Sequence, residues 1–173
     1  MDAESPFMRT LRFGFAGVFA ALVLLCVASC PMHATAQWAA PSPSSAYSIP
    51  TSMLLQPEEL NRLLQTPAAE KPLVLQVGSR VLYDQAHILH SEYAGPGMQD
   101  AGAQMLRNRV ASLSHKTFIV LYCGCCPWNR CPNVGPAYKL LLDMGFTRVK
   151  VLYLADNFGA DWVSKGFPVE STH

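Results

Sequence analysis

The sequence lacks an excess of charge of either sign, and it lacks a cluster of basic residues. Its 13 Lys and Arg residues nearly balance its 12 Asp and Glu residues, and the formal net charge is +1. A near-neutral chain without a basic patch offers little attraction to a polyanion, so we expect no nucleic-acid binding. The chain also lacks an internal repeat, a phosphate-binding glycine loop, catalytically paired carboxylates and a Ser-His-Asp arrangement. What it does contain is six cysteines.

A hydrophobic run of full membrane-spanning length is also lacking. The apolar run FGFAGVFAALVLLCVAS, at residues 13–29, is short for a span, which needs roughly 20 residues. Two arginines precede it, and the small residues ATA follow at 34–36. This order is typical of a secretory signal peptide. We therefore predict a signal over residues 1–36 and a periplasmic protein; a signal retained as a membrane anchor is the alternative.

Cys30 offers a second interpretation of the same segment. VASC, at residues 27–30, resembles the lipobox of bacterial lipoproteins, in which the cysteine is acylated and tethers the protein to a membrane. We favour cleavage after Ala36, because short patterns of small residues arise easily in signal peptides and because Pro31 directly follows the cysteine. Cys26 and Cys30 would then be ordinary apolar members of the signal.

The mature chain divides into a linker and one domain. Residues 37–50, QWAAPSPSSAYSIP, are rich in Pro, Ser and Ala and almost free of charge, which predicts a linker. Residues 51–173 have a normal size for one domain with one core. All four cysteines of this domain lie between residues 123 and 131. They therefore cannot join distant parts of the fold, although an oxidising compartment favours disulfides.

Helical and strand patterns alternate along the domain. Amphipathic or capped segments predict helices at 56–65, 99–113 and 134–146, the last with Asn133 as N-cap. Shorter helical segments are expected at 81–87 and within 156–170, and strands at 71–78, 117–122 and 148–154. Residues 88–97 are expected to be extended and then broken by Gly-Pro-Gly. Apolar strands that alternate with helices predict an α/β fold with a mainly parallel sheet.

The stretch FIVLYCGCCPWNRCPN, at residues 118–133, places the four cysteines between a strand and a helix. Ligands of parallel α/β sheets bind at the carboxyl ends of the strands. Cys123 is the first residue after the strand, and an adjacent helix start would favour its thiolate, which is the nucleophilic form. Gly124 allows a tight turn, and Arg130 could pair with a thiolate or an oxyanion. The alternative is a small buried residue at a strand end.

The order of several motifs resembles a single rhodanese-like (thiosulfate sulfurtransferase) domain over about residues 51–170. The matching pieces, in chain order, are PEEL, PLVLQV, YDQAHI, IVLYC, LLLDMGFTRV and WVSKGFPV. The resemblance implies a five-stranded, mainly parallel sheet with helices on both faces. It also implies that Cys123 carries sulfane sulfur as a persulfide, without a cofactor, from a small donor such as thiosulfate or a persulfide to a thiol acceptor. A membrane is expected as a partner only if Cys30 is lipidated or the signal is retained.

The sequence departs from this family at two places. Gln76, Val77 and Gly78 stand where the family usually has Asp-x-Arg, and Asn133 and Val134 stand where its loop closes on Arg-Ser. The active-site loop is therefore longer than usual. The inserted residues include the additional cysteines and Trp128. Ordinary transfer from thiosulfate to cyanide is less expected than sulfur or thiol chemistry in general.

The additional cysteines allow three interpretations. Cys125 could resolve a persulfide or sulfenate on Cys123, or Cys126 and Cys131 could form a disulfide that closes the loop. The third interpretation is a soft-metal site. Zinc usually takes two separated pairs of ligands, which are absent here, whereas Cu(I) accepts two or three thiolates. The alternative function is then a non-enzymatic domain that binds Cu(I) or a partner through the loop, with all four of Cys123, Cys125, Cys126 and Cys131 as candidate ligands.

Two further side chains have open interpretations. Trp128 is expected either to cap a pocket over Cys123 or to pack on the domain surface. His87 matches a histidine of the resembled family, and we interpret it as structural because the sequence shows no partner for its ring.

Overall fold

The computed structural model describes residues 48–67 and 71–172. The expected signal at 1–36, with Cys30, and most of the expected linker at 37–50 lie outside the described residues. Ile49, near the end of that linker, packs against the core of the domain. Within the described part of the chain, no helix combines the length and the hydrophobicity that crossing a membrane requires.

The core of the domain is a five-stranded parallel sheet with the order β1-β6-β5-β2-β4. This confirms the expected α/β class and its sheet. The strands are β1 (Leu54–Leu55), β2 (Leu73–Gln76), β4 (Glu92–Tyr93), β5 (Ile119–Tyr122) and β6 (Val149–Leu152). The edge strands β1 and β4 have two residues each; β4 lies within the segment expected to be extended, whereas β1 is too short to show a pattern in the sequence. A second, antiparallel pair joins β3 (His87–Ile88) to β7 (Val169–Glu170).

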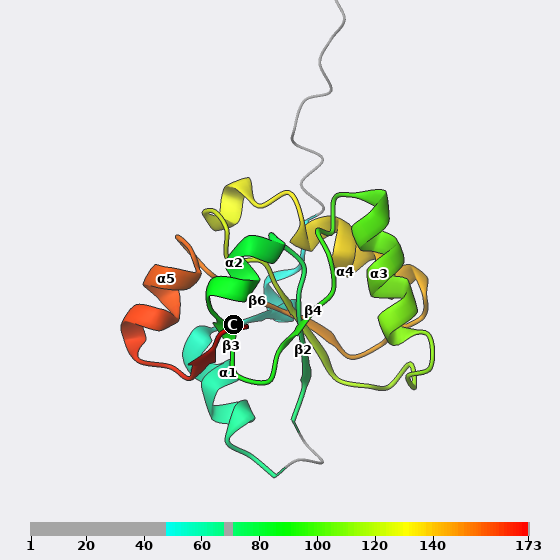
Figure 1. Ribbon diagram of the computed structural model, residues 1–173. Helices are drawn as coiled ribbons and strands as arrows, with labels where there is room; N and C mark the ends of the chain where they lie inside the picture. Colours follow the sequence, from blue (N-terminus) through cyan, green and yellow to red (C-terminus); the bar gives the residue numbers. More distant parts are fainter. Residues whose placement is uncertain (1–47, 68–70, 173) are drawn as a thin grey trace, which may run out of the picture. The chain divides into compact units, whose positions relative to one another are not determined.

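Helices cover both faces of the sheet (Figure 1). The α-helices are α1 (Pro57–Leu64), α2 (Arg80–Gln85), α3 (Asp100–Val110), α4 (Val134–Asp143) and α5 (Phe158–Asp161). Single 3₁₀ turns are η1 (Thr51–Met53), η3 (Trp128–Arg130) and η4 (Val163–Lys165). Helices α3 and α4 pack on one face, and α1 and the segment after α5 pack on the other. Helix α4 ends earlier than expected, before Gly145, whose φ of 88° leaves the helical region.

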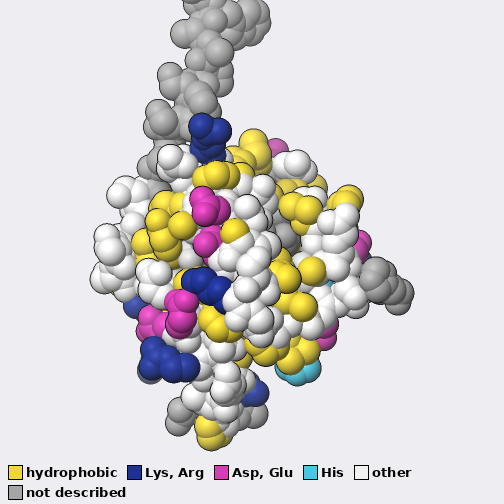
Figure 2. All heavy atoms as spheres, turned by 90° about the vertical axis from the view of Figure 1, so that its left-hand side faces the viewer, with side chains coloured by type: hydrophobic (Ala, Val, Ile, Leu, Met, Phe, Trp, Pro, Cys, Tyr) yellow, Lys and Arg dark blue, Asp and Glu magenta, His cyan; other side chains and the backbone are white. Residues whose placement is uncertain are grey.

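The side view toward α5 shows hydrophobic side chains in separate groups among acidic, basic and uncharged polar atoms (Figure 2). Among the described residues drawn there, the two signs of charge are interspersed rather than gathered into a field of one sign. Electrostatic attraction over this face is therefore local and depends on individual side chains.

The central strand β5 distributes its side chains between the two cores. Ile119 and Leu121 belong to the core on the α3 and α4 side, whereas Val120 and Tyr122 belong to the other. Side chains alternate along a strand, and Cys123 continues the alternation into the first of these cores. The register of β5 therefore directs the Cys123 side chain toward α3 and α4.

Two leucines that differ in burial test which residues form the core. Leu121 is fully buried in β5, whereas Leu142 on α4 is 39% exposed. We expect Leu121→Ala to lower the free energy of unfolding by about 2–5 kcal/mol, because it leaves a cavity beside β5. Leu142→Ala is expected to change it by no more than about 0.5 kcal/mol. Urea unfolding measures both, and equal losses would contradict the assignment of the core.

Candidate functional site

The four loop cysteines gather at the carboxyl end of β5. All four are free thiols in the structure; Cys123 is buried, Cys126 and Cys131 are partly buried and Cys125 is exposed. The Sγ atoms of Cys123 and Cys125 lie 3.1 Å apart, and those of Cys125 and Cys126 lie 3.3 Å apart. Cys131 also interacts with Cys123. Cys123 therefore contacts two thiols at once, and one of them reaches solvent.

A clamp on the backbone fixes Cys123 from the neighbouring strand. The Gln76 side chain donates from Nε2 to the Cys123 carbonyl at 3.2 Å and accepts at Oε1 from the Gly78 amide at 3.0 Å. Gly78 approaches so closely that a Cβ atom there would lie 2.7 Å from the Cys123 Sγ. The residues that replace the family's usual Asp-x-Arg thus hold Cys123 and leave room for its sulfur. The sequence motif marked these positions as unusual but gave no sign of this contact.

The amide groups at the start of α4 serve a different cysteine from the one we expected. The backbone amides of Asn133 and Val134 stabilise the thiolate of Cys131, not that of Cys123. Asn133 lies at the N-cap position of α4, as predicted, but its backbone is already helical and its side chain makes no cap hydrogen bond. Its Nδ2 instead donates to the Cys123 Sγ at 3.4 Å, and its Oδ1 accepts from the Met98 amide at 3.2 Å.

One shared proton governs the pKa values of the cluster. The thiol of Cys123 donates to Cys125 and lowers the pKa of Cys125 to about 6. Contact with the same thiol, together with the α4 amides, lowers the pKa of Cys131 to about 7. Donation to Cys125 and Cys131, followed by burial, raises the pKa of Cys123. At neutral pH the negative charge therefore lies on Cys125 or Cys131, and Cys123 holds the proton between them.

Burial, followed by the neighbouring Cys125, raises the pKa of Cys126 to about 12. Cys126 is therefore a neutral thiol at physiological pH, although it lies beside the exposed Cys125. Electrostatics therefore distinguishes Cys125 from Cys126, although the two are neighbours in the sequence. Cys125 is the thiol that is both exposed and readily ionised.

Gly124 makes the turn that brings Cys125 back over Cys123. Its φ is 78°, in the left-handed region that favours glycine. A Cβ atom at this position would lie 2.6 Å from the Cβ of Phe158, and the Gly124 carbonyl accepts from the Phe158 amide at 3.0 Å. Helix α5 therefore fixes this turn, and both the backbone conformation and the contact require glycine.

Trp128 and Arg130 differ in their surroundings. The Trp128 ring packs at 5.3 Å from that of Tyr153, and its amide donates to the Ala155 carbonyl at 3.1 Å. These contacts support the interpretation of Trp128 as a packing residue. Arg130 is exposed, and its guanidinium makes no ion pair or hydrogen bond with any residue of the described ranges. The expected pairing of Arg130 with a thiolate is therefore absent from the described part of the chain.

His87 has the partners that the sequence did not show. Its Nδ1 lies 2.7 Å from the Tyr83 carbonyl oxygen, and its ring stacks on that of Tyr83 at 3.8 Å between centroids. Its Nε2 lies 3.4 Å from a carboxylate oxygen of Glu170. These contacts join α2, β3 and β7, and they support a structural role for His87.

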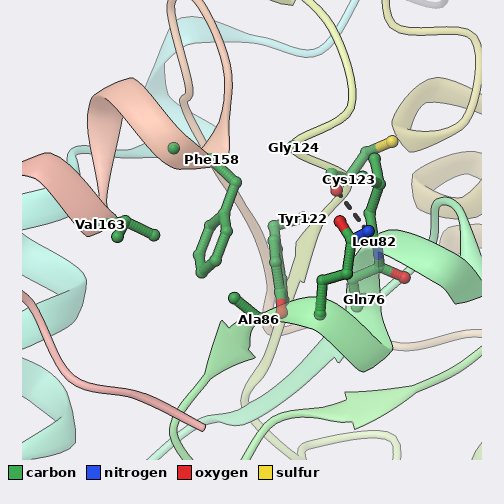
Figure 3. A pocket seen from close by; sticks show the side chains of 10 residues that line it. Gln76, Leu82, Ala86, Tyr122, Cys123, Gly124, Phe158 and Val163 are labelled. Carbon is green, nitrogen blue, oxygen red and sulfur yellow. Dashed lines mark hydrogen bonds between the residues drawn. The ribbon is translucent and has the colours of Figure 1, made fainter. Parts of the chain in front are cut away.

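Two hollows flank the turn at Gly124. The first has a volume of about 220 Å³ and is lined by Gln76, Leu82, Gln85, Ala86, Tyr122, Cys123, Gly124, Phe158, Gly159 and Val163. Figure 3 shows that the Cys123 sulfur points away from Phe158 in this view. The second hollow, of about 530 Å³, is more open and is lined by Leu82, Gly124, Cys125, Cys126, Pro127, Asp156, Asn157 and Ala160. We call the second hollow the Cys125 groove.

Within residues 48–67 and 71–172, no group of three or more His, Cys, Asp or Glu side chains is arranged to hold a metal ion. The structure thus offers no support among these residues for the alternative in which all four loop cysteines are ligands. The sulfur contacts are instead those of thiols that share protons.

Comparison with known proteins agrees on the fold. No protein-family model matches the chain, and no curated protein matches it. The solution structure of the rhodanese-like domain of the Alr3790 protein from Anabaena sp. superposes with a TM-score of 0.50 at 23% identity, covering 69% of this chain and 79% of that one. A crystal structure of Alr3790 gives a TM-score of 0.51 at 23% identity, covering 68% and 91%. The chain has a rhodanese-like fold.

A larger protein contains the same fold. The wild-type structure of EanB superposes on the rhodanese-like domain with a TM-score of 0.50 at 21% identity, covering 69% of this chain but 27% of EanB. At these identities the likeness concerns the fold. The chemistry of the rhodanese-like domain therefore depends on its own residues, above all on those of the loop between β5 and α4.

The ionisation of Cys125 can be measured directly. We expect iodoacetamide to alkylate Cys125 of the rhodanese-like domain with a half-maximal rate near pH 6, because the neighbouring Cys123 thiol lowers its pKa to about 6. Cys126 is expected to react far more slowly throughout the neutral range, because its pKa is raised to about 12. Peptide mapping by mass spectrometry follows each site. A Cys125 midpoint at the ordinary thiol value of about 8.5 would contradict the proton sharing.

Two glycines with similar φ angles test how tightly the turn at Gly124 packs against α5. Gly166 has a φ of 72° and no atom within 4 Å of a Cβ at its position, whereas Gly124 has a φ of 78° and the close contact with Phe158. We expect Gly166→Ala to cost about 1–2 kcal/mol from backbone strain alone. Gly124→Ala is expected to cost about 1–3 kcal/mol more, because of overpacking. Urea unfolding measures the difference, and a zero difference would show that the loop moves freely away from α5.

Proposed function

We propose that this rhodanese-like domain moves sulfane sulfur from a small donor to a thiol acceptor through a persulfide on Cys123. The observation that carries the proposal is the place of Cys123, which ends the central strand of a rhodanese-like fold with a free, buried sulfur. The donor that the chemistry allows is thiosulfate or a persulfide, and the acceptor is a thiolate. The domain uses no cofactor in this scheme.

The neighbouring sulfurs support the first step by accepting a proton. Cys123 gives its proton to Cys125, whose sulfur lies 3.1 Å away, and the Cys123 thiolate attacks the sulfane sulfur of the donor. The bond within the donor breaks, its electron pair leaves with sulfite or with a thiolate, and a persulfide remains on Cys123. An acceptor thiolate then attacks the outer sulfur of this persulfide, and Cys123 leaves as a thiolate. No net oxidation takes place over the two steps.

The surroundings of Cys123 suit a stored persulfide. Cys123 is 4% exposed, so oxidants in the solvent have little access to the sulfur while it is stored. The Asn133 amide donates to that sulfur at 3.4 Å, and such a donor stabilises negative charge. The Gln76 clamp holds the backbone in place while the sulfur reacts.

We place this activity in the periplasm, in keeping with the signal expected at residues 1–36. An oxidising compartment drives spare thiols toward disulfides, and four free cysteines in one loop are exposed to that pressure. The active form therefore depends on a reducing partner that keeps the loop thiols free, and a thiol acceptor can also play that part.

Mass spectrometry of the reduced, purified chain tests the proposal. After incubation with thiosulfate or with a polysulfide, alkylation and peptide mapping are expected to find a mass increase of one sulfur at Cys123. Cys123→Ser is expected to abolish sulfur transfer to an added thiol. Leu142→Ala is the control, because Leu142 is exposed on α4 and lines neither hollow, and it is expected to leave the transfer rate unchanged.

The decisive negative result is a chain whose loop cysteines gain no sulfur from either donor while the fold is intact. Transfer that continues in Cys123→Ser at the rate of the parent would also refute the role of Cys123. In either case the alternative of a binding domain with this fold would be preferred.

A further inference from the structure

The burial of Cys123 raises the question of how sulfur from a donor reaches it. Cys123 is 4% exposed, and its Sγ contacts Cys125, Cys131, Asn133 and the backbone of Gly78. A donor must bring its sulfane sulfur to within bonding distance of the attacking sulfur. These contacts crowd the space around Cys123 that a donor would need, so direct attack of Cys123 on a donor in solution requires the loop to open.

The first hollow does not provide that route. Its lining includes Cys123, but it lies on the side of Tyr122 and Phe158, which belong to the opposite core from Cys123. Figure 3 shows the sulfur directed away from the Phe158 side of this hollow. A molecule bound there would meet the backbone of the strand end rather than the thiol.

The Cys125 groove reaches the cluster from outside. Cys125 lines it and is exposed, and its sulfur lies 3.1 Å from that of Cys123. Cys126 lines the same groove, but its high pKa keeps it neutral. Cys131 has a lower pKa than Cys126, but it lines neither hollow. Cys125 alone among the four loop cysteines combines access to solvent, contact with Cys123 and a thiolate at neutral pH.

We propose that Cys125 is a second catalytic residue, which exchanges sulfur with the donor and the acceptor in the groove and relays it to and from the buried Cys123. This inference rests on the proposed sulfur transfer and assigns its point of entry. In this route the immediate donor to Cys123 is the persulfide of Cys125, not the molecule in solution.

Each step of the relay balances without an oxidant. The Cys125 thiolate attacks the outer sulfur of an organic persulfide, the sulfur–sulfur bond of the donor breaks, and a thiolate leaves. The Cys123 sulfur then attacks the outer sulfur on Cys125, whose own sulfur leaves as a thiolate, and the proton of Cys123 passes to the transferred sulfur. A low pKa makes a thiolate a better leaving group, which suits Cys125. The reverse exchange returns the sulfur to Cys125, from which an acceptor thiolate removes it.

The groove also favours one class of donor. Its lining contains the carboxyl side chain of Asp156 and no Lys or Arg. A dianion such as thiosulfate gains no attraction from such a lining, and the carboxylate repels it. An organic persulfide carries less charge at its reacting end, and cysteine persulfide is therefore the probe for the relay.

The experiment follows the position of the sulfur with time. The reduced full chain and its Cys123→Ser, Cys125→Ser and Leu142→Ala variants receive cysteine persulfide, and alkylation at set times precedes fragmentation by mass spectrometry. In the parent we expect sulfur first at Cys125 and then at Cys123. In Cys123→Ser the sulfur is expected to remain at Cys125. In Cys125→Ser we expect loading of Cys123 to slow by roughly tenfold or more, because the loop must open locally to admit the donor.

The outcomes separate the relay from the proposed function. Loading of Cys123 in Cys125→Ser at the parent rate would overturn the relay and leave the sulfur transfer standing. A Cys123–Cys125 disulfide with release of hydrosulfide, in place of a persulfide on Cys123, would also overturn the relay. No sulfur on any loop cysteine of the parent would refute the proposed function itself. Leu142→Ala, at an exposed position of α4 that lines neither hollow, is expected to match the parent. Cys125→Ala repeats the test with a side chain that cannot hydrogen-bond to Cys123.

Discussion

The alternation of side chains along β5 is the constraint from which the arrangement of the site follows. Tyr122 turns into the core shared with α1 and Trp162, so Cys123 must turn toward α3 and α4. A sulfur on that side meets Asn133 at the start of α4 and the backbone of Gly78 beyond β2. The inserted loop then closes over it, because Gly124 turns the chain back at a positive φ. A buried thiol beneath an exposed one is the consequence.

A single proton links the reactivity of the loop thiols. The Cys123 thiol has one hydrogen, and Cys125 and Cys131 compete for it. When it lies toward one of them, the other loses part of the support for its negative charge. The cluster therefore behaves as one acid with several positions for its charge, and a change at any of these cysteines alters the ionisation of the others. The α4 amides favour Cys131, whereas exposure to solvent favours Cys125.

The sequence allowed most of the fold to be predicted, because the apolar strands and amphipathic helices carry clear periodicities. It could not reveal β1, since two residues make no pattern and its pairing depends on a distant partner. It gave β4 only as part of a longer extended segment at 88–97, without its place in the sheet. The position of Cys123 at a strand end followed from the order of the elements. The contacts that set its chemistry did not. Gln76 and Asn133 act through hydrogen bonds across the sheet and the loop, and a one-dimensional pattern does not show which amide at a helix start meets which sulfur.

The close approach of Gly78 to the Cys123 sulfur ties two parts of the sequence to each other. Any residue larger than glycine at position 78 would place a Cβ atom at 2.7 Å from that sulfur and at 3.0 Å from the Gln76 amide. The sulfur would then have to rotate outward, toward the space that the inserted loop now fills. Relatives that carry a side chain at this position should therefore differ in the loop as well, so that the two segments change together during divergence. Exchanging one of them alone between homologues would yield a misfitted chimera.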